Sequence, residues 1–197
     1  MAVLINPFGF VPQPTWNASD KDGDITLSNG DLTATLVPVV NEKGSVRALV
    51  AISAGKVYIE ATSGAAGSNS SDWRFGIGKS TMSLAAGVGQ DANGWALQGN
   101  GQKITNGSAS AYGTANSNSD NLMLALDATA GSLWFGRAGT WLNSGDPAAG
   151  TGAAFTGLSG PFYLAFGAEA EGIGRAITLK GVGAYLYSPP SGFSRGG

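Results

Sequence analysis

The sequence predicts an all-β fold: a jelly-roll-like sandwich of two antiparallel sheets, preceded by a short extended arm. Apolar and polar residues alternate in short runs along most of the chain, which is typical of half-buried strands. The 32 glycines recur with Ser–Asn clusters at short intervals, as turns do in a sandwich. No window combines sustained helical periodicity with capping residues, and only residues 80–87 are candidates for one short helical turn.

The arm is expected to comprise residues 1–14, and the sandwich domain residues 15–197. Prolines at three arm positions disfavour a helix or a central strand. The arm is nevertheless strongly apolar, because it contains Val3, Leu4, Ile5, Phe8, Phe10 and Val11. An apolar segment is not expected to stay exposed, so we predict that these six residues bind a partner surface. Two arrangements remain open: the arm folds back over the domain's own sheet edge, or it docks onto another chain.

Strand-like segments follow one another through the domain. Residues 25–27 and 32–36 alternate around the turn sequence 28–31, which is typical of a hairpin. The other expected strands are 46–50, 56–60, 73–77, 95–97, 122–126, 133–135, 162–166 and 177–179. Between two of them, a turn is expected at Gly131, and Asp127 is expected to close it.

The composition excludes several classes of function. The chain has no cysteine and no histidine, so thiolate chemistry, a Ser-His-Asp triad and a metal site with Cys or His ligands are excluded. Eleven basic and thirteen acidic residues are scattered without a basic stripe, and nucleic-acid binding is therefore not expected. No signal peptide and no apolar run of the roughly 20 residues that a membrane helix needs are apparent. We expect no cofactor.

Two short motifs resemble chemical sites without completing them. Residues 75–81 contain Gly-Lys-Ser, but Trp73 stands where a phosphate-binding loop requires a glycine, so an aromatic strand is the better interpretation. Residues 20–24 resemble the start of a calcium loop, but Ile25 stands where that loop has its glycine. We expect a solvated turn there.

Paired carboxylates on a sandwich fold would permit glycoside hydrolysis. The candidate residues are Glu60, Asp91, Asp127, Glu169 and Glu171. Glycines on both sides of Glu169 and Glu171 indicate a loop rather than a strand that fixes two carboxylates on one face. We therefore predict that the chain is not an enzyme.

The five tryptophans are the side chains best suited to stacking on a ligand. Core packing is expected for Trp16, Trp73, Trp95 and Trp134, which lie in or beside apolar alternation. Trp141 follows a Gly-rich turn and is expected to be the most exposed. Together with Asp146 and Pro147, it marks a candidate ligand or partner loop.

The order of these segments resembles the SPRY domain, a concanavalin A-like sandwich, from about Trp16 to Phe193. The resemblance is carried by residues 27–30, 44–48, 56–60, 75–78, 94–95, 122–127, 131–135, 157–163 and the Ser-Pro-Pro-Ser-Gly-Phe exit at 188–193. It implies a binding module rather than a catalyst. More narrowly, residues 143–152 followed by 154–158 resemble the version found in bacteriophage structural proteins. The strand at 56–60 lacks the family's usual tryptophan, and residues 136–139 replace its Tyr-Lys-Asn-Gly turn, so no inherited peptide site is carried over.

The resemblance implies a non-enzymatic structural protein of a bacteriophage virion, either a capsid decoration or a tail-fibre-type appendage. Such a protein would be assembled in the host cytoplasm, act as a homo-oligomer or in many copies, and dock on other virion proteins through its arm. Two alternatives remain open. One is an adhesin that binds a carbohydrate or host receptor through the sandwich loops, and the other is an intracellular peptide-binding module.

Overall fold

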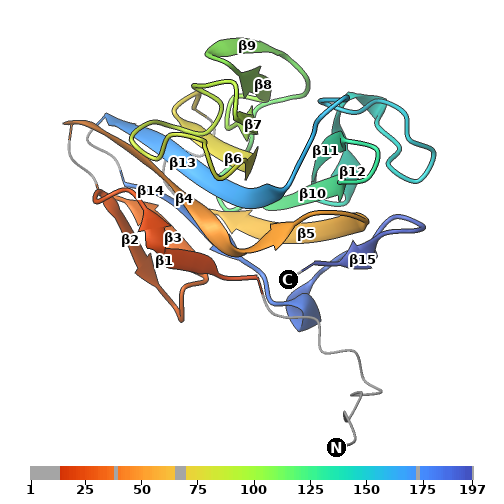
Figure 1. Cartoon of the computed structure of the whole chain (residues 1–197), viewed down its shortest axis with the longest axis horizontal. Coiled ribbons are helices and arrows are strands. Elements are labelled where there is room, and N and C mark those ends of the chain that lie inside the picture. Colours follow the sequence, from red (N-terminus) through yellow and green to blue (C-terminus); the bar gives the residue numbers. More distant parts are fainter. Residues whose placement is uncertain (1–13, 38–39, 65–69, 172–173, 197) are drawn as a thin grey trace, which may run out of the picture.

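The structure is a computed structural model that describes residues 14–37, 40–64, 70–171 and 174–196. Two antiparallel sheets stack face to face and form a sandwich (Figure 1). The all-β fold predicted from the sequence is therefore confirmed. Within the described ranges, the helical elements are two 3₁₀ helices, η1 (Leu142–Ser144) and η2 (Val182–Ala184). Residues 80–87 form turns and bends and no helical turn.

Sheet A begins at an edge formed by the first strand of the domain. Its strands, in spatial order, are β1 (Trp16–Lys21), β4 (Val40–Ile52), β13 (Phe162–Glu171), β6 (Trp73–Gly78), β7 (Gly94–Gln98), β8 (Gln102–Thr105) and β9 (Ser108–Ala111).

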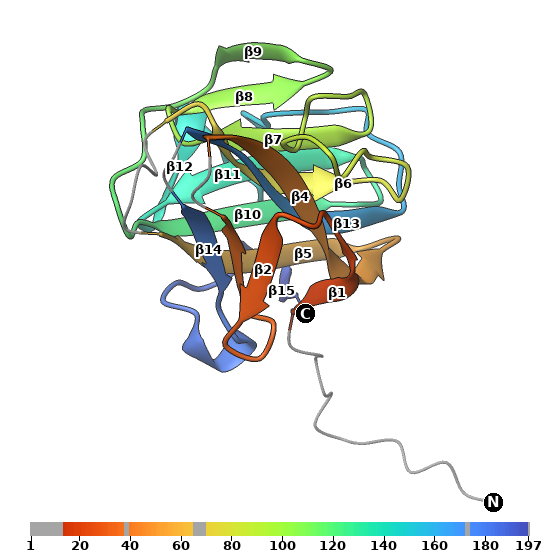
Figure 2. The ribbon, with the colours of Figure 1, turned by 90° about the vertical axis from the view of Figure 1, so that its left-hand side faces the viewer.

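Sheet B has the spatial order β12 (Thr140–Trp141), β11 (Ser132–Arg137), β10 (Asn121–Asp127), β5 (Lys56–Ser63), β14 (Arg175–Leu179), β3 (Thr33–Leu36) and β2 (Ile25–Ser28). In addition, β15 (Ser194–Arg195) pairs in parallel with the start of β5. Both views show β15 beside β5 (Figures 1 and 2).

Five of these strands were not expected from the sequence, namely β1, β8, β9, β12 and β15. They are short or polar: β1 reads Trp-Asn-Ala-Ser-Asp-Lys, and all four residues of β9 are exposed. Pairing with a neighbour, and not apolar alternation, therefore creates them. One expectation was wrong, because residues 169 and 171 belong to β13 and not to a loop. Pairing with β4 extends this strand through its glycines.

The main core lies between the sheets and is dominated by aromatic side chains. Trp16 and Trp73 both contact Phe166, with ring centroids 6.5 and 6.2 Å apart. Burial of such large side chains contributes roughly 25 cal/mol per Å² of apolar surface removed from water. The prediction of core packing is confirmed for Trp16, Trp73 and Trp134, but Trp95 is only half-buried.

The outer face of each sheet is also covered, by the long connections. Met123, Ala125 and Trp134 of sheet B pack against Tyr185 and Phe193 of the C-terminal segment. On sheet A, the loop that follows β6 covers a smaller cluster of Met82, Val88, Ala96, Ile104 and Ala165. Strand β10 is therefore buried on both faces, which explains its continuous apolar run.

The turn between β10 and β11 has the predicted form. The carboxylate of Asp127 accepts hydrogen bonds from the amides of Thr129 and Ala130, at 3.1 and 2.8 Å. Gly131 adopts a φ of +66°, and a Cβ there would lie 2.1 Å from the carbonyl oxygen of Leu158. Only glycine therefore fits this position.

Candidate functional site

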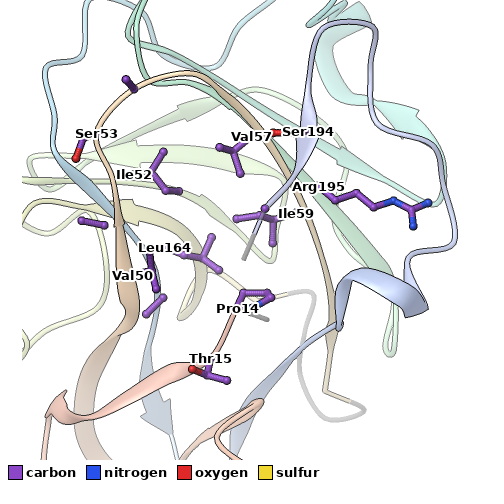
Figure 3. A pocket seen from close by; sticks show the side chains of 14 residues that line it. Pro14, Thr15, Val50, Ile52, Ser53, Val57, Ile59, Leu164, Ser194 and Arg195 are labelled. Carbon is purple, nitrogen blue, oxygen red and sulfur yellow. The ribbon is translucent and has the colours of Figure 1, made fainter. Parts of the chain in front are cut away.

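An apolar pocket opens at the end of the sandwich where β1 begins. It has a volume of about 400 Å³. We call it the edge pocket; its lining comprises Pro14, Thr15, Ala48, Val50, Ala51, Ile52, Ser53, Ala54, Val57, Ile59, Leu164, Ser194, Arg195 and Gly196. Figure 3 shows that Val50, Ile52, Val57 and Leu164 line the same space. Protein interiors rarely contain voids larger than a water molecule, so a cavity of this size is a site that can be filled.

The pocket exists because one strand of sheet A ends before its neighbour. Trp16 of β1 lies opposite Ala48 of β4, and both side chains are buried between the sheets. Beyond this pair, Val50 and Ile52 continue the same face of β4. Val50 is 42% exposed there. The apolar layer thus extends past the point where the described part of β1 covers it.

The edge of β4 is also open at this point. On the β1 side, the last backbone hydrogen bond of β4 to a described residue runs from the Leu49 amide to the Thr15 carbonyl, at 2.9 Å. On the opposite side, β4 is paired with β13 as far as Ile52. In the described ranges, no strand pairs with Ala51 and Ile52 on the β1 side. An open edge beside an apolar pocket is the arrangement that accepts an additional strand.

The C-terminal segment forms another wall of the edge pocket. The Gly196 amide donates to the Tyr58 carbonyl at 2.9 Å, and the Tyr185 hydroxyl donates to the Gly196 carbonyl at 2.9 Å. A Cβ on Gly196 would lie 2.0 Å from a methyl group of Val57, so the close approach requires glycine. Arg195 points away from the pocket (Figure 3) and donates to the Val182 carbonyl at 2.9 Å. The guanidinium group is therefore directed away from the apolar side chains that line the pocket.

The carboxylates considered for hydrolysis have structural partners. Glu60 is completely buried on the outer face of β5. Its two oxygens accept hydrogen bonds from the Tyr58 hydroxyl, the Asn121 side chain and the amides of Leu186 and Tyr187, at 2.8–2.9 Å. Two of these four donors, the amides of Leu186 and Tyr187, belong to the connection that covers sheet B. This residue anchors the C-terminal segment.

The remaining carboxylate candidates are also engaged. Asp91 accepts hydrogen bonds from the amides of Ser83 and Asn93, at 2.7 and 2.8 Å. Glu169 pairs with Arg74 at 3.1 Å. Asp127 closes its turn, and the side chain of Glu171 lies outside the part of the chain that the structure describes. These contacts give each described carboxylate a role in stabilising a loop or a strand.

The acidic segment at 20–24 forms an ion pair within the sandwich. Asp20 binds Arg47 through two hydrogen bonds of 2.7 and 2.8 Å, and Arg47 also donates to the Met82 carbonyl at 2.7 Å. The Asp22 carboxylate accepts from the Asp24 amide. Over the described ranges, no group of three or more Asp or Glu residues is placed to hold a metal ion.

The Gly-Lys-Ser sequence follows an aromatic strand, as the sequence indicated. Gly78 ends β6, and Lys79 lies 5.8 Å above the ring of Trp95. The residues directly after it, 79–87, form turns and bends and no helix. In the described ranges, no helix is long and apolar enough to cross a membrane.

The three residues of the candidate ligand loop do not share one surface. Trp141 is half-buried against the ring of Tyr58, with centroids 6.1 Å apart. Pro147 is buried. Asp146 is exposed, but its carboxylate accepts hydrogen bonds from the amides of Ala148 and Ala149, at 3.0 and 3.1 Å. The six apolar arm residues, from Val3 to Val11, lie outside the described residues.

The sequence did not single out the edge pocket, although part of its signal was present. The segment 46–50 was expected to be a strand, and apolar residues continue past it at Ile52. What a sequence pattern cannot show is that β1 ends beside Ala48 while β4 continues. The pocket depends on this difference in strand length.

Comparison with known proteins agrees with the fold. The solved structure of the SPRY domain of human HERC1 is similar, with a TM-score of 0.69 and 14% identity over 84% of this chain and 97% of that one. The TRIM65 PSpry domain has a TM-score of 0.64 and 18% identity over 86% and 92% of the two chains. Stonustoxin has a TM-score of 0.62 and 19% identity over 86% of this chain, which spans 27% of that one.

A search of curated protein sequences finds no match. The model of the SPRY domain family, in contrast, matches residues 56–180, which is more than half of the chain. The matched region runs from β5 through β14 and includes Glu60 and the β10–β11 turn. This chain belongs to the SPRY domain family.

Proposed function

We propose that this chain is a non-enzymatic protein-interaction module that binds an extended apolar protein segment in the edge pocket. The bound segment adds a strand to β4. One observation carries the proposal: β4 continues past the Trp16–Ala48 pair with an open edge on the described β1 side, directly above an apolar cavity. Membership of the SPRY family supports a role in protein–protein interaction.

The two parts of the site would contribute differently to binding. Hydrogen bonds to the backbone of Ala51 supply affinity with little dependence on sequence, as in other cases of strand addition. The pocket supplies specificity, because it accepts every second side chain of an extended segment and has apolar walls. Burial of apolar side chains there contributes about 25 cal/mol per Å².

We also propose a setting for this module: the virion of a bacteriophage, where it acts in many copies as a capsid decoration or a tail-fibre-type subunit. Support comes from the resemblance of residues 143–158 to phage structural proteins. The charged fraction of 12% adds to it, because few charged groups need to be desolvated in an assembly. Electron microscopy of purified particles labelled with an antibody against the chain is the test. Label on capsids or tails is expected, and label confined to particle-free lysate would refute this setting.

The binding proposal is tested with the full chain and a library of random peptides. Peptides selected on the wild-type chain should carry apolar residues at every second position. Val50→Glu places a charge in the pocket at a position exposed enough to tolerate it, and it should abolish their binding. Leu49→Glu is the matched control, because Leu49 is 59% exposed on the opposite face of β4. Peptides that bind the wild-type chain and the Val50→Glu variant equally would refute the edge pocket as the site.

A further inference from the structure

The chain enters β1 directly over the edge pocket. Pro14 is buried and lines the pocket, and the Thr15 carbonyl accepts the Leu49 amide. A strand that continued backward from Thr15 would therefore run along the open edge of β4. We propose that the segment that fills the edge pocket is residues 8–13 of the same chain, of which Gln13 and Pro12 continue β1 antiparallel to β4 as far as its end at Ile52. This inference rests on the proposed binding site and names its occupant.

The hydrogen-bond phase of β1 fits the positions of the arm prolines. The Leu49–Thr15 bond flanks the Trp16–Ala48 pair, so these two residues form a non-hydrogen-bonded pair. Continuing this register pairs Gln13 with Ala51, and their backbone groups face each other. Pro12 and Pro14 then occupy positions where an amide would point away from β4. Proline has no amide hydrogen, so both prolines fit this edge strand without loss of a ladder bond.

The side chains of the arm also alternate in the required phase. The side chain of Trp16 is buried between the sheets, and residues at every second position share its face. In an arm that stays extended, Phe8, Phe10 and Pro12 would share the inward face of Pro14, whereas Val11 and Gln13 would face outward. The inward set is entirely apolar, as are the walls formed by Val50, Ile52, Val57, Ile59 and Leu164.

The length of the arm matches the length of the pocket. The pocket is lined by Ala48 and by the residues from Val50 to Ala54, and the continued register places Ala48 to Ile52, where β4 ends, opposite residues 16 to 12. With an arm that stays extended past Pro12, Phe10 would lie near Ser53 and Ala54, at the far end of the pocket. From Pro14 to Phe10, an extended chain spans about 13 Å, and no turn is needed.

Tethering favours the chain's own arm over a competing segment. A segment linked by a short connection has an effective concentration on the order of millimolar. A second copy or a partner in solution must exceed this value or release the arm first. A partner segment would therefore have to compete with residues 8–13 for the edge pocket.

The register is tested by disulfide formation in the full chain, which has no native cysteine. Gln13→Cys with Ala51→Cys places two thiols on a directly opposed pair, whose Cα atoms are expected about 5.5 Å apart, within disulfide reach. Oxidation in dilute solution should give an intramolecular bond in monomers. Gln13→Cys with Leu49→Cys is the control, offset by two residues on the same face, and should cross-link much more slowly. Intermolecular dimers would instead show that the arm fills a second copy, and absence of the 13–51 bond would refute the register.

Paired arm substitutions test the occupancy independently. Phe10→Ala should lower the melting temperature of the full chain by on the order of 5–10 °C, because it removes a buried aromatic side chain. Val11→Ala, on the outward face, should change it by about 1 °C or less. Equal effects of the two substitutions would overturn the proposal.

Binding of the selected peptides separates this inference from the proposed function. If the arm closes the pocket, Phe10→Ala should strengthen peptide binding about tenfold or more, and Val11→Ala should leave it unchanged. Peptide binding that is sensitive to Val50→Glu but not to Phe10→Ala would leave the site intact and refute the arm as its occupant. Insensitivity to Val50→Glu would refute the site itself.

Discussion

The hydroxyl group of Tyr58 donates a hydrogen bond of 2.9 Å to the carboxylate of Glu60, two residues further along the same face of β5. Both side chains are completely buried. The same carboxylate accepts the amides of Leu186 and Tyr187, so one residue of a central strand holds the connection that covers sheet B. A charged group is retained in the interior because every neighbour directed at it is a donor.

Replacement of this carboxylate should be costly. In Glu60→Gln, an amide group faces donors and leaves at least one of them unpaired, so we expect the free energy of unfolding to fall by about 2–4 kcal/mol. Urea denaturation followed by tryptophan fluorescence measures the loss. Glu42→Gln is the control: the nearby Asp24 and Asp22 raise the pKa of Glu42, so removing its charge should cost nothing. Equal stability of the two variants would contradict the anchoring role of Glu60.

Alkaline pH should destabilise the fold through its buried tyrosines. A tyrosine hydroxyl ordinarily has a pKa of about 10. Burial raises the pKa of Tyr112 to about 12, and burial also raises the pKa of Tyr58 and of Tyr185. The unfolded chain therefore releases these protons before the native state does, and stability present below about pH 10 should fall as the pH rises toward 12.

The measurement is a series of urea midpoints between pH 8 and pH 11.5, with phenolate absorbance recorded in parallel. Tyr112→Phe removes one of the groups and should make the decline with pH shallower. An unchanged slope in this variant would show that Tyr112 does not contribute to the alkaline loss.

The Asp20–Arg47 ion pair should have a larger coupling energy than a typical ion pair at the surface. Arg47 is nearly buried and binds Asp20 through two parallel hydrogen bonds. A double-mutant cycle of Asp20→Asn and Arg47→Met is expected to give a coupling energy of about 1–3 kcal/mol. A value near zero would place this contact among the exposed pairs that contribute little.

The close approach of the C-terminal segment to β5 should not tolerate a side chain at Gly196. Gly196→Ala would place a methyl group against Val57, so β15 should detach from β5. Faster hydrogen exchange at the amide of residue 196 and a lower melting temperature are expected. Gly183→Ala is the matched control, because a Cβ at Gly183 meets nothing within 4 Å. Similar hydrogen exchange in both variants would argue against a tightly packed tail.

The sequence allowed the fold class and most central strands to be predicted, because residues such as Ala34 and Leu36 alternate with Thr33 and Thr35 in the period-two pattern that one-sided burial imposes. It also identified Asp127 as a turn residue, since local hydrogen bonding is encoded within a few positions. It could not show that Glu60 is a structural anchor, because the donors of Leu186 and Tyr187 lie more than 120 positions away. The edge pocket escaped prediction for the same reason: it arises between β4, β5 and β15, which only the fold brings together.

The two-sided burial of β10 affects how its pairing with β5 is chosen. A shift of one residue would exchange Leu122, Leu124 and Leu126 for Met123 and Ala125, and every exchanged side chain would still be apolar. The burial of apolar side chains alone therefore discriminates poorly between alternative registers of these two strands. The choice falls to polar contacts at either end of the ribbon, where Asn121 reaches Glu60 and Lys56 meets Asp127. A few polar contacts thereby set the register between two strands whose facing side chains are almost all apolar.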